Sequence, residues 1–196
     1  SLESSVMLDR ITPVNKALLL ANIAVFGLQY LIPGLIEDSL ALWPPRAEQY
    51  GGSAFHVWQL LTYGFLHGGV THLFFNMFAL YMFGSEIERL LGPKRYLIYY
   101  LWCVVGAAAM HLIVVATSNL TPYPTVGASG AVFGLLLAFG MAYPQRMLIL
   151  IFPPIPMRAW LFVTLYGLFE LYMGVTQTQQ GVAHFAHLGG MATGFV

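Results

Sequence analysis

Long apolar stretches alternate along this chain with short segments that are polar or rich in glycine and proline. Six stretches are apolar over most of their length, namely residues 14–33, 70–91, 94–116, 127–143, 157–174 and 183–196. About 20 helical residues, at 1.5 Å each, cross the ~30 Å hydrocarbon core of a bilayer. The pattern therefore predicts an all-α fold, a polytopic membrane bundle of six transmembrane helices.

Composition agrees with a membrane setting. Hydrophobic residues make up 58% of the chain and charged residues only 8%, and the mean hydropathy is +0.72. Soluble domains are about 25% charged, so we expect a multi-pass integral membrane protein with the lipid bilayer as its surroundings. The formal net charge is zero, which gives no reason to expect nucleic acid as a partner. The single cysteine, Cys103, excludes an internal disulfide.

Basic residues gather in the segments that would lie on one side of a six-span bundle. With a cytoplasmic N-terminus, Arg46 alone falls outside, and the cytoplasmic set is Arg10, Lys16, Arg89, Lys94, Arg95, Arg146 and Arg158. Because cytoplasmic loops are enriched in Lys and Arg, the distribution predicts this orientation.

Domain organisation is expected to be simple. Residues 1–13 are predicted to be a cytoplasmic segment, in which residues 1–6 precede Met7 and are expected to be foreign to the natural chain. Residues 14–196 are predicted to form one six-span domain. The last apolar stretch is only about 21 Å long as a helix, so we expect the natural chain to continue beyond Val196.

Two connecting segments and the end of the second span carry specific expectations. Residues 34–57 are predicted to lie at the membrane interface, since they include Trp43 and several apolar residues. Residues 152–156, with three prolines, are predicted to form an irregular cytoplasmic turn. Glu88 and Arg89, near the cytoplasmic end of the second span, are expected to fix the turn that follows them.

Candidate chemistry lies in the outer halves of three spans. Ser129 begins one span within GASG, and His187 lies in the last one. Gly130 and Gly190 are small enough to let these helices pack closely, which would bring the imidazole within reach of the hydroxyl. A serine hydroxyl needs a base to accept its proton, and neutral imidazole serves at ordinary pH. With no carboxylate at that depth of either span, the sequence predicts a Ser–His dyad.

Polar residues of the second span could complete such a site. His72 and Asn76 are four residues apart and share a helix face. Their side chains, with a backbone N–H at the start of the Ser129 helix, are suitable donors to an oxyanion. Gly68 and Gly69 would allow His67 to turn back toward the same site.

Taken together, these residues resemble the rhomboid family of intramembrane serine proteases, from Trp58 to Gly194. The resemblance rests on HGGVTHLFFN, on the Gly84, Glu88 and Gly92 pattern, on GASGAVFG and on AHFAHLGGMATG. Two departures are Gln59, where some members have Arg, and Phe133, where some have Tyr packed against the catalytic histidine.

The resemblance implies specific roles. Ser129 would be the nucleophile and His187, not His184, the base, with His72, Asn76 and the Ser129 amide as the oxyanion hole. The supporting residues would be Gly127, Gly130, Phe133, His67, His184 and Gly190. The implied activity is serine endopeptidase cleavage of transmembrane segments in other membrane proteins, without a cofactor or metal. The implied location is the bacterial inner (plasma) membrane, with the active site opening to the outer face.

Other readings of the same residues remain. His67, His72, His184 and His187 could gather around zinc, although the chain has no HExxH motif. A catalytically silent scaffold that binds transmembrane helices is the main alternative function. A channel or transporter is less favoured, because no charged or broken-helix element is evident at the midplane.

Overall fold

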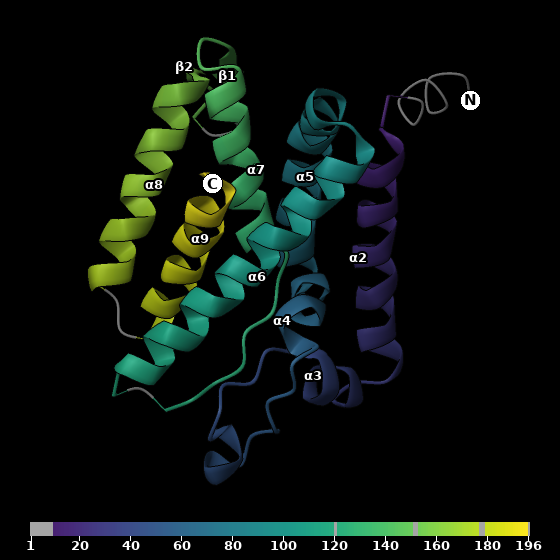
Figure 1. Cartoon of the computed structure of the whole chain (residues 1–196), viewed down its shortest axis with the longest axis vertical. Helices are drawn as coiled ribbons and strands as arrows, with labels where there is room; N and C mark the ends of the chain where they lie inside the picture. Colours follow the sequence, from purple (N-terminus) through teal and green to yellow (C-terminus); the bar gives the residue numbers. More distant parts are fainter. Residues whose placement is uncertain (1–9, 120, 151–152, 177–178, 196) are drawn as a thin grey trace.

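The computed structural model describes residues 10–119, 121–150, 153–176 and 179–195, and helices dominate it. The six longest helices within this described part have bounds close to the predicted stretches (Figure 1). They are α2 (Pro13–Leu31), α5 (Val70–Leu91), α6 (Pro93–Thr117), α7 (Ser129–Ala142), α8 (Ala159–Thr176) and α9 (Gln179–Phe195). Judged by length and composition alone, the described helices that are long and apolar enough to cross a membrane are α2 and α6.

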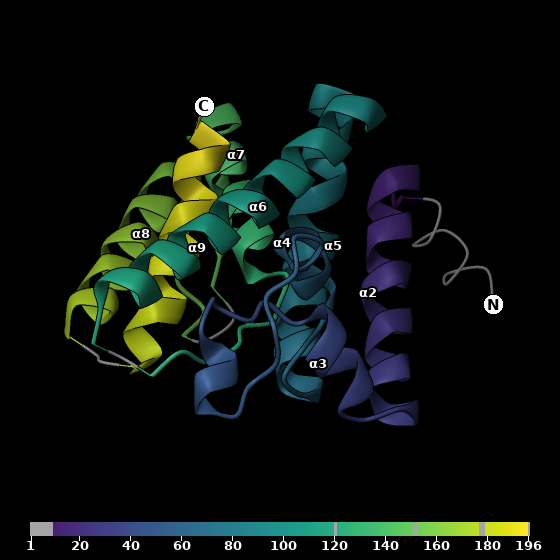
Figure 2. The ribbon, with the colours of Figure 1, turned by 60° about the horizontal axis from the view of Figure 1, so that its bottom comes forward.

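The helices form a bundle around α7. Nine of the 14 residues of α7 are buried, and α5, α6, α8 and α9 all contact it. α2 lies at one edge of the bundle and packs on α5, while α8 lies at the opposite edge (Figures 1 and 2). An extended segment reaches the start of α7 from the bundle end, where Thr125 pairs with Leu42. Ser129 therefore begins a helix inside the molecule.

Small residues let α7 and α9 approach each other closely. A Cβ added to Gly190 of α9 would lie 2.0 Å from the Gly130 carbonyl oxygen of α7, and α6 is similarly close to α7, since a Cβ added to Gly134 would lie 2.4 Å from the Cys103 sulfur of α6. No side chain fits at those distances. Backbone approach of this kind is the usual way in which membrane helices pack.

The face of α2 that meets the bundle is mainly polar. Asn15, Asn22 and Gln29 are spaced seven residues apart and are buried together with Leu18. Asn15 donates to the Leu80 carbonyl and accepts a 2.7 Å hydrogen bond from the Tyr96 hydroxyl. Hydrogen bonds from Asn15, together with the packing of Leu18 in the core, hold this helix to α5.

The expectation that Glu88 and Arg89 fix the turn after α5 holds only for the Glu88 backbone carbonyl, which accepts the Gly92 N–H at 2.8 Å; the two side chains contact the start of α2 instead. The buried carboxylate of Glu88 accepts the backbone N–H groups of Val14 and Asn15, at 3.1 and 2.8 Å. Arg89 donates to the Arg10 carbonyl oxygen. The first N–H groups of a helix lack intrahelical partners, and a carboxylate there also interacts favourably with the helix dipole. Both side chains thus fasten the start of α2.

The proline-rich connection is not simply an irregular turn. β1 (Met147–Ile149) and β2 (Pro156–Arg158) form an antiparallel pair in which Met147 is opposite Arg158. Prolines still prevent a helix here. Pro156 is tolerated because it is the first residue of β2, where the backbone N–H that proline lacks is not needed for pairing. The intervening residues 151–152 lie outside the described part.

The long connection between α2 and α5 folds into short helical turns. They are α3 (Leu35–Leu40), η1 (Ala47–Tyr50), α4 (Gln59–Thr62) and η2 (Tyr63–Phe65). Gln59 is fully buried at their centre: its Oε1 accepts N–H groups of Trp43 and His56, and its Nε2 donates to the Ala54 carbonyl. This glutamine, a departure from the family pattern, therefore organises the connection.

Candidate active site

The Ser129 hydroxyl and the His187 imidazole meet between α7 and α9. His187 Nε2 lies 2.9 Å from Ser129 Oγ, which is hydrogen-bond distance. Gly190, one turn after His187, allows this because it lies directly against the Gly130 backbone. A hydroxyl in contact with an imidazole nitrogen is the arrangement that general-base activation of a serine requires.

Aromatic rings hold the His187 imidazole in place. The Phe133 ring, one turn after Ser129, stacks on it with centroids 4.4 Å apart and planes 17° apart. The His184 ring approaches edge-on, at 6.0 Å and 90°. His184 itself meets the Phe169 ring of α8, so it lies behind His187 and not against Ser129. Stacking restricts rotation of the imidazole and keeps Nε2 directed at the hydroxyl.

The hydrogen bonding of His72 indicates which of its nitrogens carries the proton. Gly68 N–H donates to His72 Nδ1 at 3.2 Å, so Nδ1 is the acceptor. In a neutral imidazole the other nitrogen then carries the proton, which makes Nε2 a donor. A Cβ added to Gly127 would lie 3.0 Å from His72 Nε2 and 3.6 Å from Ser129 Oγ. The donor nitrogen therefore faces the backbone immediately before Ser129.

A glycine is required at position 127 for the His72 ring to lie so close to the backbone before Ser129. Its φ of +128° is a conformation that residues with side chains rarely adopt, and a side chain would also strike His72. The Gly127 N–H is fixed by a 3.0 Å bond to the Tyr63 carbonyl. Tyr63 in turn donates its hydroxyl to the Val104 carbonyl of α6 at 2.6 Å.

Two further sets of donors lie on α5 and α7, the helices that carry His72 and Ser129. Asn76 is buried, on the same face of α5 as His72, and its Nδ2 has no hydrogen-bond partner within the described residues. The N-cap of α7 is Ala128, which supplies no side-chain acceptor for the first N–H groups of that helix. Unsatisfied buried donors are costly unless something occupies them. Such donors suit a transient negative charge.

His67 is buried beside His72 but lies further from Ser129. Its ring meets the His72 ring at 5.1 Å, and Gln29 holds its backbone by accepting the His67 N–H and donating to the His67 carbonyl. Burial, with a smaller contribution from neighbouring His72, lowers the pKa of His67 to about 4. The ring is therefore neutral at ordinary pH and positions His72 by packing.

Sequence reasoning missed two residues that hold this site in place, Gln29 and Tyr63. Gln29 had a detectable signal, because a polar side chain in an apolar span needs a buried partner. Tyr63 holds Gly127 through its backbone carbonyl, and the sequence has no feature that would reveal such a contact. Within the described residues, no three of His, Cys, Asp and Glu converge as metal ligands, so the four histidines considered for zinc do not form such a group.

Comparison with known proteins identifies the family. The family model described as "Rhomboid domain" matches residues 54–196. The chain belongs to the rhomboid family. The match confirms the resemblance to rhomboids. It also confirms that the chain is an integral membrane protein, as the family implies.

Several rhomboid relatives resemble the chain over long regions. RHOMBOID-like protein 4 of Arabidopsis thaliana is 37% identical over 139 residues, which are 71% of this chain and 32% of the relative. Rhomboid protease GluP of Bacillus subtilis is 42% identical over 79 residues, 40% of the chain and 14% of GluP. YdcA of the same organism, a provisionally named rhomboid protease, is 35% identical over 128 residues, 64% of the chain and 60% of YdcA. This rhomboid chain thus spans less than two thirds of each relative.

Proposed function

We propose that this rhomboid chain is an intramembrane serine endopeptidase that cleaves transmembrane segments of other membrane proteins. The observation that carries the proposal is the 2.9 Å contact between Ser129 Oγ and His187 Nε2. Two relatives carry names that include "rhomboid protease", which supports the same reaction class.

The reaction would follow from the positions of these groups. As Ser129 Oγ attacks the scissile carbonyl carbon, its proton passes to His187 Nε2. The negative charge on the former carbonyl oxygen is stabilised by His72 Nε2–H, Asn76 Nδ2–H and the Ser129 N–H. His187 then returns the proton to the leaving amine, which departs and leaves an ester on Ser129. Water hydrolyses this ester in a second attack, again with His187 as the base.

The six long helices would each span the bilayer, with the N-terminus in the cytoplasm. In support, the start of α2, the α5–α6 junction and the β1–β2 hairpin lie at one end of the bundle, and these segments carry most of the basic residues (Figure 1). The α3–η1 segment lies at the other end. The α7 helix is only about 21 Å long. A helix shorter than the hydrocarbon core would place Ser129 below the outer surface of a bacterial inner membrane.

Substrate helices would approach through a groove between α5 and α8. This groove has a volume of about 1010 Å³, and apolar side chains from both helices line it, among them Phe75, Phe78, Phe83, Phe162 and Leu165. An apolar groove open to lipid accepts a transmembrane segment without an unpaired polar group. A helical carbonyl is shielded by its i to i−4 hydrogen bond, so substrates with helix-breaking residues near the cut are expected to react fastest.

Replacing either member of the dyad tests the proposal. We expect Ser129→Ala and His187→Ala to abolish cleavage of a model transmembrane substrate while the detergent-solubilised proteins stay folded. A fluorophosphonate probe should label the wild type and fail to label Ser129→Ala. Ser118→Ala and His56→Ala are matched controls, because both residues lie outside the site and should leave cleavage and labelling unchanged.

The same experiment separates the alternatives. Retained cleavage in Ser129→Ala or His187→Ala would overturn the dyad. Absence of both cleavage and probe labelling in the wild type would favour a silent scaffold that binds transmembrane helices. Cleavage that is lost on treatment with a zinc chelator would contradict a metal-independent mechanism.

A further inference from the structure

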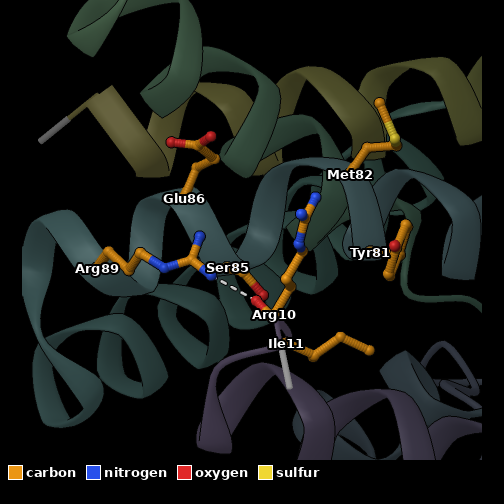
Figure 3. Close-up of a pocket in the computed structure, with 7 residues that line it drawn as sticks. All are labelled: Arg10, Ile11, Tyr81, Met82, Ser85, Glu86 and Arg89. Atoms are coloured by element: carbon orange, nitrogen blue, oxygen red, sulfur yellow. Dashed lines mark hydrogen bonds between the residues drawn. The ribbon is translucent and has the colours of Figure 1, made fainter. Parts of the chain in front are cut away.

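A second, polar pocket lies between the start of α2 and the cytoplasmic half of α5, outside the proposed active site. Figure 3 shows its lining, which is Arg10, Ile11, Tyr81, Met82, Ser85, Glu86 and Arg89. Its volume is about 390 Å³, enough for a small polar headgroup. Neither the proposed dyad nor the substrate groove uses these side chains except Met82, which borders both cavities.

Positive charge dominates the pocket. Within the described residues, neither Arg10 nor Arg89 is in an ion pair, and both side chains are exposed. The one acidic side chain of the lining, Glu86, is paired with Arg146 at 3.1 Å, and in Figure 3 its carboxylate points away from Arg89. Two unpaired guanidinium groups beside a neutralised carboxylate attract an anion.

Local hydrogen bonds leave the guanidinium groups as the main anion-binding elements. The N–H groups at the start of α2 are already taken, that of Thr12 by Ser85 Oγ and those of Val14 and Asn15 by Glu88. Arg89 donates one N–H to the Arg10 carbonyl (Figure 3). That bond orients Arg89 across the pocket and leaves its other donors available, since a guanidinium has five.

We propose that this pocket binds an anionic phosphate group, which in a membrane is supplied by a lipid headgroup. A guanidinium fork matches phosphate geometry better than a lysine does. Ile11 and the half-exposed Met82 provide apolar contact at the pocket edge, where acyl chains would begin. The pocket lies at the end of the bundle where basic residues gather, which is where anionic lipid headgroups are attracted. A bound phosphate would bridge α2 to α5 by contacting Arg10 and Arg89 together.

Lipid binding to the purified full chain tests this proposal. Native mass spectrometry in a neutral detergent would compare retention of phosphatidylglycerol with that of zwitterionic phosphatidylcholine. We expect phosphatidylglycerol to bind more tightly, and Arg10→Gln to weaken its binding about fivefold, the usual effect of one basic residue near a membrane surface. Arg89→Gln should weaken binding at least as much. Added salt should weaken wild-type binding.

Controls distinguish a built pocket from diffuse surface charge. Lys94→Gln removes an exposed cation at the same end of the bundle that does not line the pocket, and it should leave binding within about twofold of wild type, because surface pairing is weak. Arg10→Gln keeps the carbonyl that Arg89 binds, so folding should be unaffected; Arg89→Gln gives an independent variant. A separate experiment measures the unfolding temperature with and without inorganic phosphate. A rise in the wild type that is absent in Arg10→Gln would show that phosphate alone is sufficient for binding to the pocket.

Specific results would overturn the proposal. Equal binding of the two lipids would do so, as would equal losses in Arg10→Gln and Lys94→Gln. Lipid binding that depends on Arg10 without any response to inorganic phosphate supports the lipid as the source. A response to both supports the phosphate group itself.

Discussion

At the scale of single residues, chemistry in this site is set by neighbours rather than by residue type. His72 and His187 have the same side chain, yet the Gly68 N–H makes His72 a donor through Nε2 while His187 presents Nε2 to a hydroxyl. His67, the third histidine in line, is neutral because burial lowers its pKa to about 4. The three imidazoles thus differ for three reasons: a hydrogen bond from Gly68 at His72, a contact with the Ser129 hydroxyl at His187, and burial at His67.

Asn76 offers a residue-scale prediction. Asn76→Ala should lower kcat for a transmembrane substrate about 100- to 1,000-fold, as loss of one oxyanion donor does elsewhere. Its Nδ2 has no partner within the described residues, so the unfolding temperature should change little. Steady-state cleavage and thermal unfolding of the same preparation measure both quantities.

Asn22→Ala is the matched control for Asn76. Asn22 is also buried, but its Nδ2 donates to the Leu18 carbonyl of its own helix α2, away from the site. The folded variant should keep wild-type kcat. Equal kcat values for Asn76→Ala and the wild type would remove Asn76 from the oxyanion hole.

At the scale of elements, the dyad depends on how closely two helices pack. Ser129 and His187 are on different helices, and the distance between their side chains is set by the Gly190–Gly130 contact. A glycine in a helix interior costs about 1 kcal/mol relative to alanine in isolation. Here the close approach offsets that cost, since it permits van der Waals contact between backbones.

Gly190→Ala tests this dependence. The new Cβ would lie 2.0 Å from a backbone oxygen, which cannot move aside, so α9 must shift away from α7. We expect loss of substrate cleavage and a lower unfolding temperature. Fluorophosphonate labelling should also fall, because the shift lengthens the Ser129–His187 contact.

Gly167→Ala in α8 provides the comparison for Gly190. Its nearest neighbour would be the Met191 Cε at 3.6 Å, an ordinary contact. Activity should be retained, with stability equal to or about 0.5–1 kcal/mol above wild type. Similar losses in the two variants would indicate that helix propensity, not helix spacing, controls the site.

At the scale of the whole molecule, we expect access to the site to depend on the size of the ligand. The extended segment before α7 leads from the bundle end toward Ser129, whereas the apolar groove between α5 and α8 opens at the side. A small reagent and a substrate helix are therefore expected to use different routes.

Blocking the groove should separate these routes. Phe78→Cys introduces a thiol on the groove wall, and the native Cys103 is buried and should not react. After modification with a bulky maleimide, cleavage of a transmembrane substrate should fall at least tenfold, while the fluorophosphonate probe should still label Ser129. Gel-based cleavage and probe labelling on one sample measure the two.

Ile23→Cys, on the exposed face of α2, controls for modification itself. Its labelled form should cleave at the wild-type rate. If modified Phe78→Cys cleaves normally, substrate helices do not enter between α5 and α8.

The long apolar stretches alone predicted the long helices of this rhomboid chain, because a segment in lipid must satisfy its own backbone and the helix does so locally. The candidate dyad was predictable as well, because Ser129 within GASG and His187 before Gly189 and Gly190 form recognisable sequence motifs. The six-span topology and the catalytic roles remain predictions. Sequence could not show that Glu88 fastens α2 or that Gln29 supports His67, because those contacts join segments far apart in the chain.

Tertiary structure alone decided the 2.9 Å dyad contact, the donor nitrogen of His72 and the hairpin at the proline-rich connection. Each depends on the distance or direction between elements that are remote in sequence. Local propensity carries no information about such distances, whereas packing of glycine faces and pairing of buried polar groups sets them.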